Sequence, residues 1–235
     1  MNEIIKFLNQ VEGGIVLDAA TGRGEFITIL KQHLKSYIQI VGIDASERSV
    51  EYAQKFFPEN DVEVYKMNLE NIQFADEYFD MVTISNSLHH LEHLDVVFKE
   101  LLRVLKPGGK LLVAEMYSDG NQSPAQQSHI MLHHWLAGVD RRYGTYHQST
   151  FGKAALEDIY ANIPLKQKHI ADFYIPVDDP NRNCQSLLKN CQDTLKRLEA
   201  IPDAEELIET GKNLIKRIQE IGCAGASRLL LTGVK

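Results

Sequence analysis

Residues 15–26, with the sequence IVLDAATGRGEF, restrict the fold of this chain more than any other segment. The run starts with three apolar residues, Ile15–Leu17, which suit a buried strand of a parallel sheet. A turn of small residues containing Gly22 and Gly24 follows, and apolar residues then recur at helical spacing. Because glycine has no side chain, such a turn lets a ligand approach the backbone, and a helix start offers N–H groups to an anion. The segment therefore predicts a strand, a ligand-binding turn and a helix.

The spacing of the glycines separates two kinds of ligand. A dinucleotide-binding turn carries a third glycine three residues after Gly24, where this chain has Ile27. The turn instead resembles the first motif of the class I S-adenosylmethionine (SAM)-dependent methyltransferases, an acidic residue followed by G-x-G-x-G. The positions of that motif are held by Asp18, Ala20, Gly22 and Gly24. Ala20 replaces the first glycine, a change that we expect the turn to accept if the φ angle of Ala20 is negative.

Two later segments carry the same resemblance more specifically. They read FDMVTISNSLHHL at residues 79–91 and RVLKPGGKLLVAEM at residues 103–116, in the order and spacing of that family. His89 and His90 belong to this pattern, so we interpret them as residues of a helix start or a pocket edge and not as metal ligands. The resemblance covers residues 15–116, with a weaker echo in the final strand. It implies an α/β fold that is Rossmann-like and doubly wound, with a mostly parallel seven-stranded sheet. Two segments outside that common core predict helical insertions after strands 5 and 6.

We expect a single methyltransferase domain over residues 1–235. Its parts are a core at 1–116, 151–175 and 226–235, a lid or substrate segment at 117–150, and a helical hairpin at 176–225. The expected strands are 15–17, 38–43, 62–67, 81–84, 110–116, 168–175 and 228–234, the last of them at the edge of the sheet. The expected helices include 2–11, 94–105, 124–136, 151–163 and 184–200, and one that Pro202 opens and Gly222 ends.

The resemblance implies SAM as the cofactor, bound across the carboxyl ends of strands one, two and four. It assigns the methionine portion to residues 18–24, which include Thr21. Asp44 lies 22 residues after Gly22, at the end of the second strand, where a carboxylate can accept hydrogen bonds from both ribose hydroxyls. Ala45 follows it in the same site. The alternative role of Asp44 is to cap the next helix, which Ser46 could also do.

Four further residues complete the expected cofactor site. Asn68 stands where similar methyltransferases have an acidic residue that contacts the adenine amino group, and its amide oxygen can still accept from that amine. The backbone of Leu69 is expected beside it. Ser85 and Asn86 fall at the carboxyl end of strand 81–84, the edge at which ligands of open α/β sheets bind.

Residues 117–150 leave the fifth strand at this edge and hold the candidate catalytic side chains. His129 and His133 are four residues apart on an expected helix, so their rings share one face. With His147 and Tyr143 they form our candidate substrate pocket, as general base and hydrogen-bond donors. A weaker hypothesis makes His129, His133 and His147 ligands of a divalent metal, and a third gives these histidines no chemical role.

Residues 184–221 show two helical patterns joined by a short link. They predict an antiparallel hairpin that caps the active site or forms a dimer contact. Cys184, Cys191 and Cys223 are too few for a disulfide framework in a chain of this length, so a reducing cytoplasm is expected. Cys184 and Cys191 share a helix face and are interpreted as small core residues. A metal role for them is a minor alternative because no histidine nearby completes a set.

Charge and hydropathy restrict the partners. The formal net charge of −7 disfavours a broad nucleic-acid-binding face, which needs a basic stripe. No run approaches the roughly 18 apolar residues of a membrane span, and the N-terminus lacks the pattern of a signal peptide. We therefore expect a small-molecule substrate, no nucleic-acid or membrane partner, and a monomer or homodimer.

Three functions remain open. The leading hypothesis is an enzyme that transfers a methyl group from SAM to a small molecule. A nicotinamide-dependent oxidoreductase is the alternative within the fold, weakened by Ile27 and by the lack of an evident hydride-transfer constellation. A SAM-binding protein without catalysis is the third, because cofactor binding and turnover use different residues.

Overall fold

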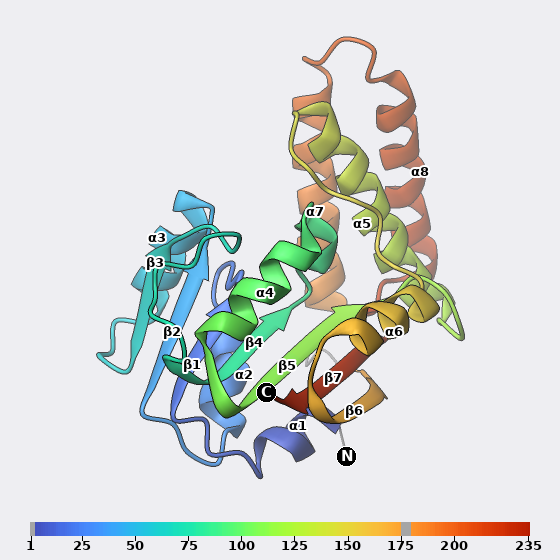
Figure 1. Ribbon diagram of the computed structural model, residues 1–235. Coiled ribbons are helices and arrows are strands. Elements are labelled where there is room, and N and C mark those ends of the chain that lie inside the picture. The colour runs from blue at the N-terminus through green and yellow to red at the C-terminus, as the bar shows by residue number, and fades with distance from the viewer. Residues whose placement is uncertain (1–2, 175–179) are drawn as a thin grey trace. The chain divides into compact units, whose positions relative to one another are not determined.

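The structure is a computed structural model that describes residues 3–174 and 180–235. Contacts gather the described chain into two compact units (Figure 1). Unit 1 takes the described residues of Met1–Glu115, Glu157–Phe173 and Leu229–Lys235, and unit 2 takes those of Met116–Leu156 and Tyr174–Arg228. The segments predicted as two separate insertions on the core therefore meet in the same unit. No helix in the described ranges combines the length and the apolar character that crossing a membrane requires.

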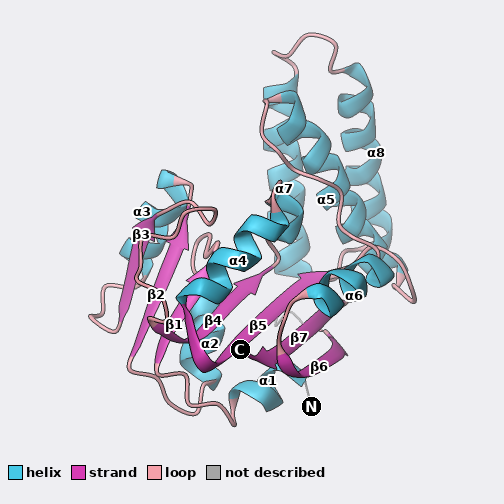
Figure 2. Ribbon diagram, in the orientation of Figure 1, coloured by secondary structure: helices cyan, strands magenta, loops and turns pink. Residues whose placement is uncertain are grey.

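Unit 1 is built on a seven-stranded sheet, counted over the described residues, in the order β3-β2-β1-β4-β5-β7-β6 (Figure 2). The strands are β1 (Ile15–Ala19), β2 (Gln39–Asp44), β3 (Val62–Lys66), β4 (Phe79–Ser85), β5 (Leu105–Met116), β6 (Lys166–Phe173) and β7 (Arg228–Val234). The pairs from β3 to β5 are all parallel, and Leu17 of β1 lies opposite Val41 and Val82. The strand order reverses between β1 and β4, so the carboxyl ends of these strands form the crevice at which such sheets bind ligands.

The prediction that β7 lies at the edge of the sheet is wrong, because β7 lies between β5 and β6. Backbone hydrogen bonds join Gly109 to Lys235 at one end of β5 and Tyr117 to Ser227 at the other, so β7 runs antiparallel to β5. The residues from Leu229 to Gly233 are buried in an unbroken run, which suits a strand with neighbours on both sides. The edge strand is β6, whose side chains are mostly exposed.

Helices cover both faces of the sheet, with α4 in front of it and α2 behind it in Figure 1. The helices of this part are α1 (Glu3–Leu8), α2 (Glu25–His33), α3 (Glu47–Phe56), the short 3₁₀ helix η1 (Leu88–His90), α4 (Leu94–Val104) and α6 (Lys153–Asn162). The apolar stripe of α4, which includes Val97 and Leu101, is buried. This packing covers the faces of the sheet, so the turns at the carboxyl ends of the strands form the candidate site.

The stop after α4 differs from its prediction in one respect. The helix was predicted over 94–105 and ends at Val104, but strand β5, predicted from residue 110, already begins at Leu105. Within this segment Gly108 has a φ of 77°, a left-handed conformation that glycine adopts readily. The extra residues of β5 produce an irregularity in the sheet, because the register between β4 and β5 shifts between Phe79 and Met81.

Unit 2 contains a cluster of three helices, α5 (Pro124–Arg142), α7 (Pro180–Leu198) and α8 (Glu205–Ile221). The start of α5 is fixed by a capping box, in which Ser123 and Gln126 each accept a backbone N–H of the other. Side chains from all three helices share one buried core: Leu132, Trp135 and Val139 of α5, Cys191 and Leu198 of α7, and Leu214 and Ile218 of α8. The predicted hairpin therefore buries its apolar stripe against α5 of its own chain, and the stripe by itself requires neither a dimer nor an active-site cap.

The prediction that the cysteines form no disulfide framework is wrong for one pair, Cys184 and Cys223. Cys184 and Cys223 form a disulfide, with Cα atoms 5.7 Å apart and 39 residues between them in sequence. Cys184 lies on α7 and Cys223 follows α8, and the packing of the two helices brings these positions together. Cys191 remains a free, buried thiol. The expectation of a reducing compartment rested on the lack of a disulfide framework, so it loses that support.

Candidate functional site

The turn after β1 is organised around the buried carboxylate of Asp18. Asp18 is only 1% exposed, and its carboxylate accepts hydrogen bonds from the hydroxyls of Thr21 at 2.6 Å and Thr83 at 2.9 Å. Burial raises the pKa of Asp18 to about 7, while the two hydroxyls favour the ionised form and oppose that shift. Asp18 therefore connects the turn after β1 to the neighbouring strand β4.

The backbone of this turn is left-handed at three residues. Ala20 has a φ of 53°, so the negative angle expected for an alanine at this position is wrong, and its methyl group is strained. Gly22 (57°) and Gly24 (88°) are the other two. A methyl group on Gly24 would lie 2.3 Å from the Phe57 ring, whereas one on Gly22 would have no neighbour closer than 3.9 Å. The turn is thus packed at Gly24 and open at Gly22.

Asp44, at the end of β2, binds the same turn. One carboxylate oxygen accepts the N–H of Gly22 at 2.8 Å and the other accepts the N–H of Ser46 at 2.8 Å. The Ser46 hydroxyl caps α3 by accepting from Ser49, so the capping alternative for Asp44 is met by Ser46. Each carboxylate oxygen keeps a second lone pair for a ligand hydroxyl. The neighbouring Ala45 is exposed.

The expected adenine residues lie in the turn after β3. Asn68 is exposed, and its amide oxygen accepts the N–H of Glu70 at 2.9 Å. That oxygen has one lone pair left for an amine. Leu69 is only 5% exposed, so its backbone and not its side chain is the part that a ligand can meet.

Asn86 carries an unusual feature just after β4. Its φ is 48°, and its N–H donates to the carbonyl of Ala114 at 2.8 Å. Its side-chain oxygen, Oδ1, is buried and receives no hydrogen bond from any described residue. A buried acceptor without a donor is unfavourable by about 1–3 kcal/mol, so it indicates a ligand that donates there. Ser85 lies beside it and accepts the Ser87 hydroxyl through its carbonyl.

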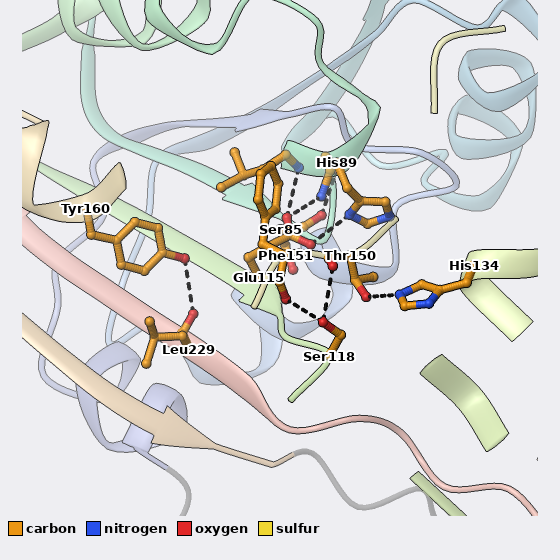
Figure 3. Close-up of polar contacts among 11 residues, drawn as sticks. Ser85, His89, Glu115, Ser118, His134, Thr150, Phe151, Tyr160 and Leu229 are labelled. Carbon is orange, nitrogen blue, oxygen red and sulfur yellow. Dashed lines mark hydrogen bonds and ion pairs between the residues drawn. The ribbon is translucent and has the colours of Figure 1, made fainter. Parts of the chain in front are cut away.

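The sequence reasoning missed Glu115, near the carboxyl end of β5. Its carboxylate is fully buried and contacts three consecutive residues, Ser87 and Leu88 through their N–H groups and His89 through Nδ1 (Figure 3). The signal was a carboxylate in the otherwise apolar run LLVAEM, but its partners lie far away in sequence. His89 is buried in η1, which agrees with its interpretation as a helix-start residue.

The residues present fit SAM at the carboxyl ends of β1, β2 and β4. Gly22 gives an open cradle for the backbone to approach a ligand, and Asn86 Oδ1 is a buried acceptor that lacks a donor. Asp44 adds a carboxylate at the strand end that is suited to hydroxyl donors. A cavity of about 510 Å³ lies elsewhere in unit 1, between α4 and α6, and contains none of the residues expected to bind the cofactor.

In unit 2, the candidate histidines form two groups. The rings of His129 and His133 are 4.7 Å apart at their centroids, which confirms their shared helix face. His129 Nδ1 accepts the N–H of Ala226 at 3.2 Å, and burial lowers the pKa of His129 to about 4. Protonation of Nδ1 would remove that acceptor, so the neutral ring is the form that fits.

His147 belongs to the second group. It is 4% exposed, and its Nδ1 lies 2.7 Å from a carboxylate oxygen of Asp140. Arg141 donates to the His147 carbonyl at 2.6 Å, and Tyr143 is 47% exposed. Within the described residues, His129, His133 and His147 do not gather into a set of metal ligands. The weak metal hypothesis for these three residues is therefore not supported.

Comparison with known proteins adds a family match. Residues 17–113 match a family model described as a methyltransferase domain. The ubiquinone/menaquinone biosynthesis C-methyltransferase UbiE of Geotalea daltonii is 30% identical over 115 residues, which are 47% of this chain and 49% of that protein. An uncharacterised methyltransferase of Schizosaccharomyces pombe is 30% identical over 170 residues, which are 67% of this chain and 55% of that protein. The chain thus spans about half the length of these curated relatives.

Solved structures share the fold over nearly the whole chain. The YcgJ protein from Bacillus subtilis has a TM-score of 0.60 at 17% identity, covering 99% of this chain and 96% of that one. Phosphoethanolamine N-methyltransferase 2 of Haemonchus contortus, solved with phosphomonomethylethanolamine and S-adenosylhomocysteine, has a TM-score of 0.58 at 16% identity. It is covered over 51% of its length and covers 99% of this chain. At these identities the likeness concerns the fold alone.

Proposed function

We propose that this chain, as a class I SAM-dependent methyltransferase, transfers a methyl group from SAM to a small-molecule acceptor. The observation that carries the proposal is the meeting of the open Gly22 turn, the Asp44 carboxylate and the buried, unpartnered Asn86 oxygen at the carboxyl ends of three neighbouring strands. A nicotinamide-dinucleotide site needs a third glycine at the position where this chain has Ile27.

The proposed cofactor contacts follow the strand ends. The turn from Asp18 to Gly24, with Ala20 and Thr21, holds the methionine portion. Asp44 holds the ribose through the carboxylate lone pairs that its hydrogen bonds with the N–H groups of Gly22 and Ser46 leave available, and Ala45 lies next to it. The remaining contacts come from Asn68 and the Leu69 backbone to the adenine, and from Ser85 and Asn86 beside β4.

When bound, SAM supplies a methyl group on a sulfonium, which a nucleophile displaces directly. The chain has to align the acceptor with that methyl group and exclude water, and alignment lowers such barriers by up to about 7–11 kcal/mol in ideal cases. A general base is needed only when an oxygen or nitrogen acceptor must lose a proton. In our proposal His147, whose ring Asp140 orients, is the base of the candidate set. His129, His133 and Tyr143 contact the acceptor.

A small-molecule acceptor is proposed because the formal charge of −7 disfavours nucleic acid. The similar proteins described above include a carbon methyltransferase and a nitrogen methyltransferase, so the acceptor atom is a question for experiment. Release of S-adenosylhomocysteine across a panel of carbon, nitrogen and oxygen acceptors is the direct test. Binding of SAM without turnover on a broad panel would favour a SAM-binding protein, and binding of NAD in place of SAM would favour an oxidoreductase.

The cofactor site is tested by Asp44→Ala. The variant leaves ribose hydroxyls without an acceptor, so SAM affinity measured by calorimetry should fall by about 1–3 kcal/mol, or roughly 5- to 150-fold. Asp44→Asn is the matched control, because it keeps one acceptor oxygen and should lose less. Wild-type affinity in folded Asp44→Ala protein would remove Asp44 from the site.

A further inference from the structure

The carboxylate of Glu115 is buried at the carboxyl end of β5 and has no role in the contacts proposed so far. Removing a carboxylate from water is costly unless donors replace the water. Here the donors are the N–H groups of Ser87 at 2.9 Å and Leu88 at 2.8 Å, and His89 Nδ1 lies 2.8 Å from the other oxygen (Figure 3). All of these contacts reach across from β5 to the turn that follows β4.

That turn fixes Asn86 from both sides. The N–H of Asn86 donates to Ala114, and the residue after it is held by Glu115 and by its own hydroxyl bond to the Ser85 carbonyl. The left-handed φ of 48° at Asn86 is maintained between these two attachments. The direction of the Asn86 side chain therefore depends on where Glu115 holds Ser87.

We propose that Glu115 is a positioning residue for the cofactor and acts through Asn86. Its carboxylate holds the Ser87–His89 segment so that Asn86 Oδ1 faces an N–H or O–H donor of bound SAM or S-adenosylhomocysteine. The inference rests on the proposed function, because the donor belongs to that ligand.

A carboxylate suits this role better than other side chains of its size. An apolar side chain would fill the same buried position at a lower desolvation cost but would accept no hydrogen bond. Glutamine would keep one acceptor oxygen and turn an N–H₂ group toward either the backbone N–H groups or the His89 ring. Glu115→Gln therefore removes half of the attachment with little change of volume.

The experiment is a double-mutant cycle on S-adenosylhomocysteine affinity, measured by calorimetry. The variants are Glu115→Gln, Asn86→Ala and the two together. Each single variant should weaken binding by about tenfold or more, and the double variant should be within about threefold of Asn86→Ala alone, because Glu115 acts through Asn86. Tyr160→Phe is the matched control. It removes a buried hydroxyl that donates to the Leu229 carbonyl in the same unit, at 3.3 Å, and should leave affinity unchanged.

Two results would overturn the inference. One is unchanged affinity in Glu115→Gln, and the other is multiplication of the two single effects in the double variant. Failure of the wild-type protein to bind S-adenosylhomocysteine would instead overturn the proposed function. If Glu115→Gln does not fold, NMR of the wild-type protein decides: the Ser87 and Leu88 amides should exchange slowly without ligand, and the Asn86 side-chain amide should shift on ligand addition. Fast exchange or an unmoved Asn86 signal would overturn the inference.

Discussion

Ala20 stores strain in the turn after β1, since a methyl-bearing residue there has a φ of 53°. The left-handed conformation costs about 1–2 kcal/mol for alanine, and glycine avoids it but gives up about 0.4–1 kcal/mol through the unfolded chain. Ala20→Gly should therefore raise the free energy of unfolding in urea by about 0.5–1 kcal/mol. Ala20→Val should lower it, because a β-branched residue tolerates a positive φ poorly. Equal midpoints for all three proteins would show that the turn is unstrained.

His129 links the stability of unit 2 to pH. Its pKa is about 4 in the folded protein against 6.5 for an ordinary histidine, because burial disfavours the charged ring. The stability that the neutral ring contributes is complete above pH 6.5 and is lost as the pH falls toward 4, by up to roughly 3 kcal/mol. Thermal melts between pH 7 and 4 should show this slope in the wild type and a flatter one in His129→Gln. Identical slopes would contradict the assignment.

At the residue scale, the sequence predicted which residues lie at the strand ends and in the turn after β1, but not the strain of that turn or its hydrogen-bond partners. Asp18, Gly22, Asp44 and Asn86 lie at or just after strand ends, as predicted, because strand ends and glycine turns are local signals, and their contacts with a cofactor remain a prediction. The role of Glu115 was invisible, since its contacts join β5 to a turn 26 to 28 residues earlier in the chain. The angle at Ala20 was also missed, because the alanine alone does not reveal its backbone conformation.

Of the glycines in the helices of unit 2, Gly211 of α8 has the closest neighbours. A methyl group there would lie 2.5 Å from Trp135 and 2.8 Å from Leu195. Gly211→Ala should therefore lower stability by about 1–2 kcal/mol, because overpacking outweighs the gain of roughly 1 kcal/mol in helix propensity. Trp135 is the chain's single tryptophan, so its fluorescence reports this packing directly. Lys212→Ala, at the exposed next position, should leave the emission unchanged, and an unaltered spectrum in Gly211→Ala would contradict the prediction.

At the element scale, periodicity found the helices and strands better than their ends. The prediction for β7, residues 228–234, matches the structure, whereas α5 extends six residues beyond its predicted end at 136. The extra turns carry Val139 into the shared core with α7 and α8, so tertiary packing and not local propensity sets that end. The place of β7 inside the sheet followed from its unbroken apolar run, which the prediction of an edge strand overlooked.

For the whole molecule, the disulfide between Cys184 and Cys223 is the main covalent constraint on unit 2. It closes a loop with a sequence separation of 39 residues, for which loop entropy gives a stabilisation of roughly 4 kcal/mol. Reduction should lower the melting temperature of the helical signal, with a loss of about 2–4 kcal/mol. The double variant Cys184→Ser with Cys223→Ser should melt like the reduced wild type and should not respond to reductant. A wild type that is indifferent to reductant would contradict the prediction.

The two-unit organisation could not be derived from the sequence. Residues 117–150 and 176–225 are far apart in the chain, and each pattern taken alone predicted only helices with one apolar face. Their shared core depends on matching surfaces, in particular Trp135 against Gly211, which no periodicity encodes. The class of sheet was accessible because parallel strands and glycine turns follow local rules.

The position of β7 between β5 and β6 determines when β6 can pair with the sheet during synthesis on the ribosome. Among the described strands β6 pairs with β7 alone, yet β6 is synthesised first, and α7 and α8 are both made before β7 follows. During that interval the backbone of β6 cannot yet pair with β7. Its sequence KQKHIADF is rich in charged and polar side chains, including Lys166 and Lys168, which discourage a waiting strand from pairing with another nascent chain.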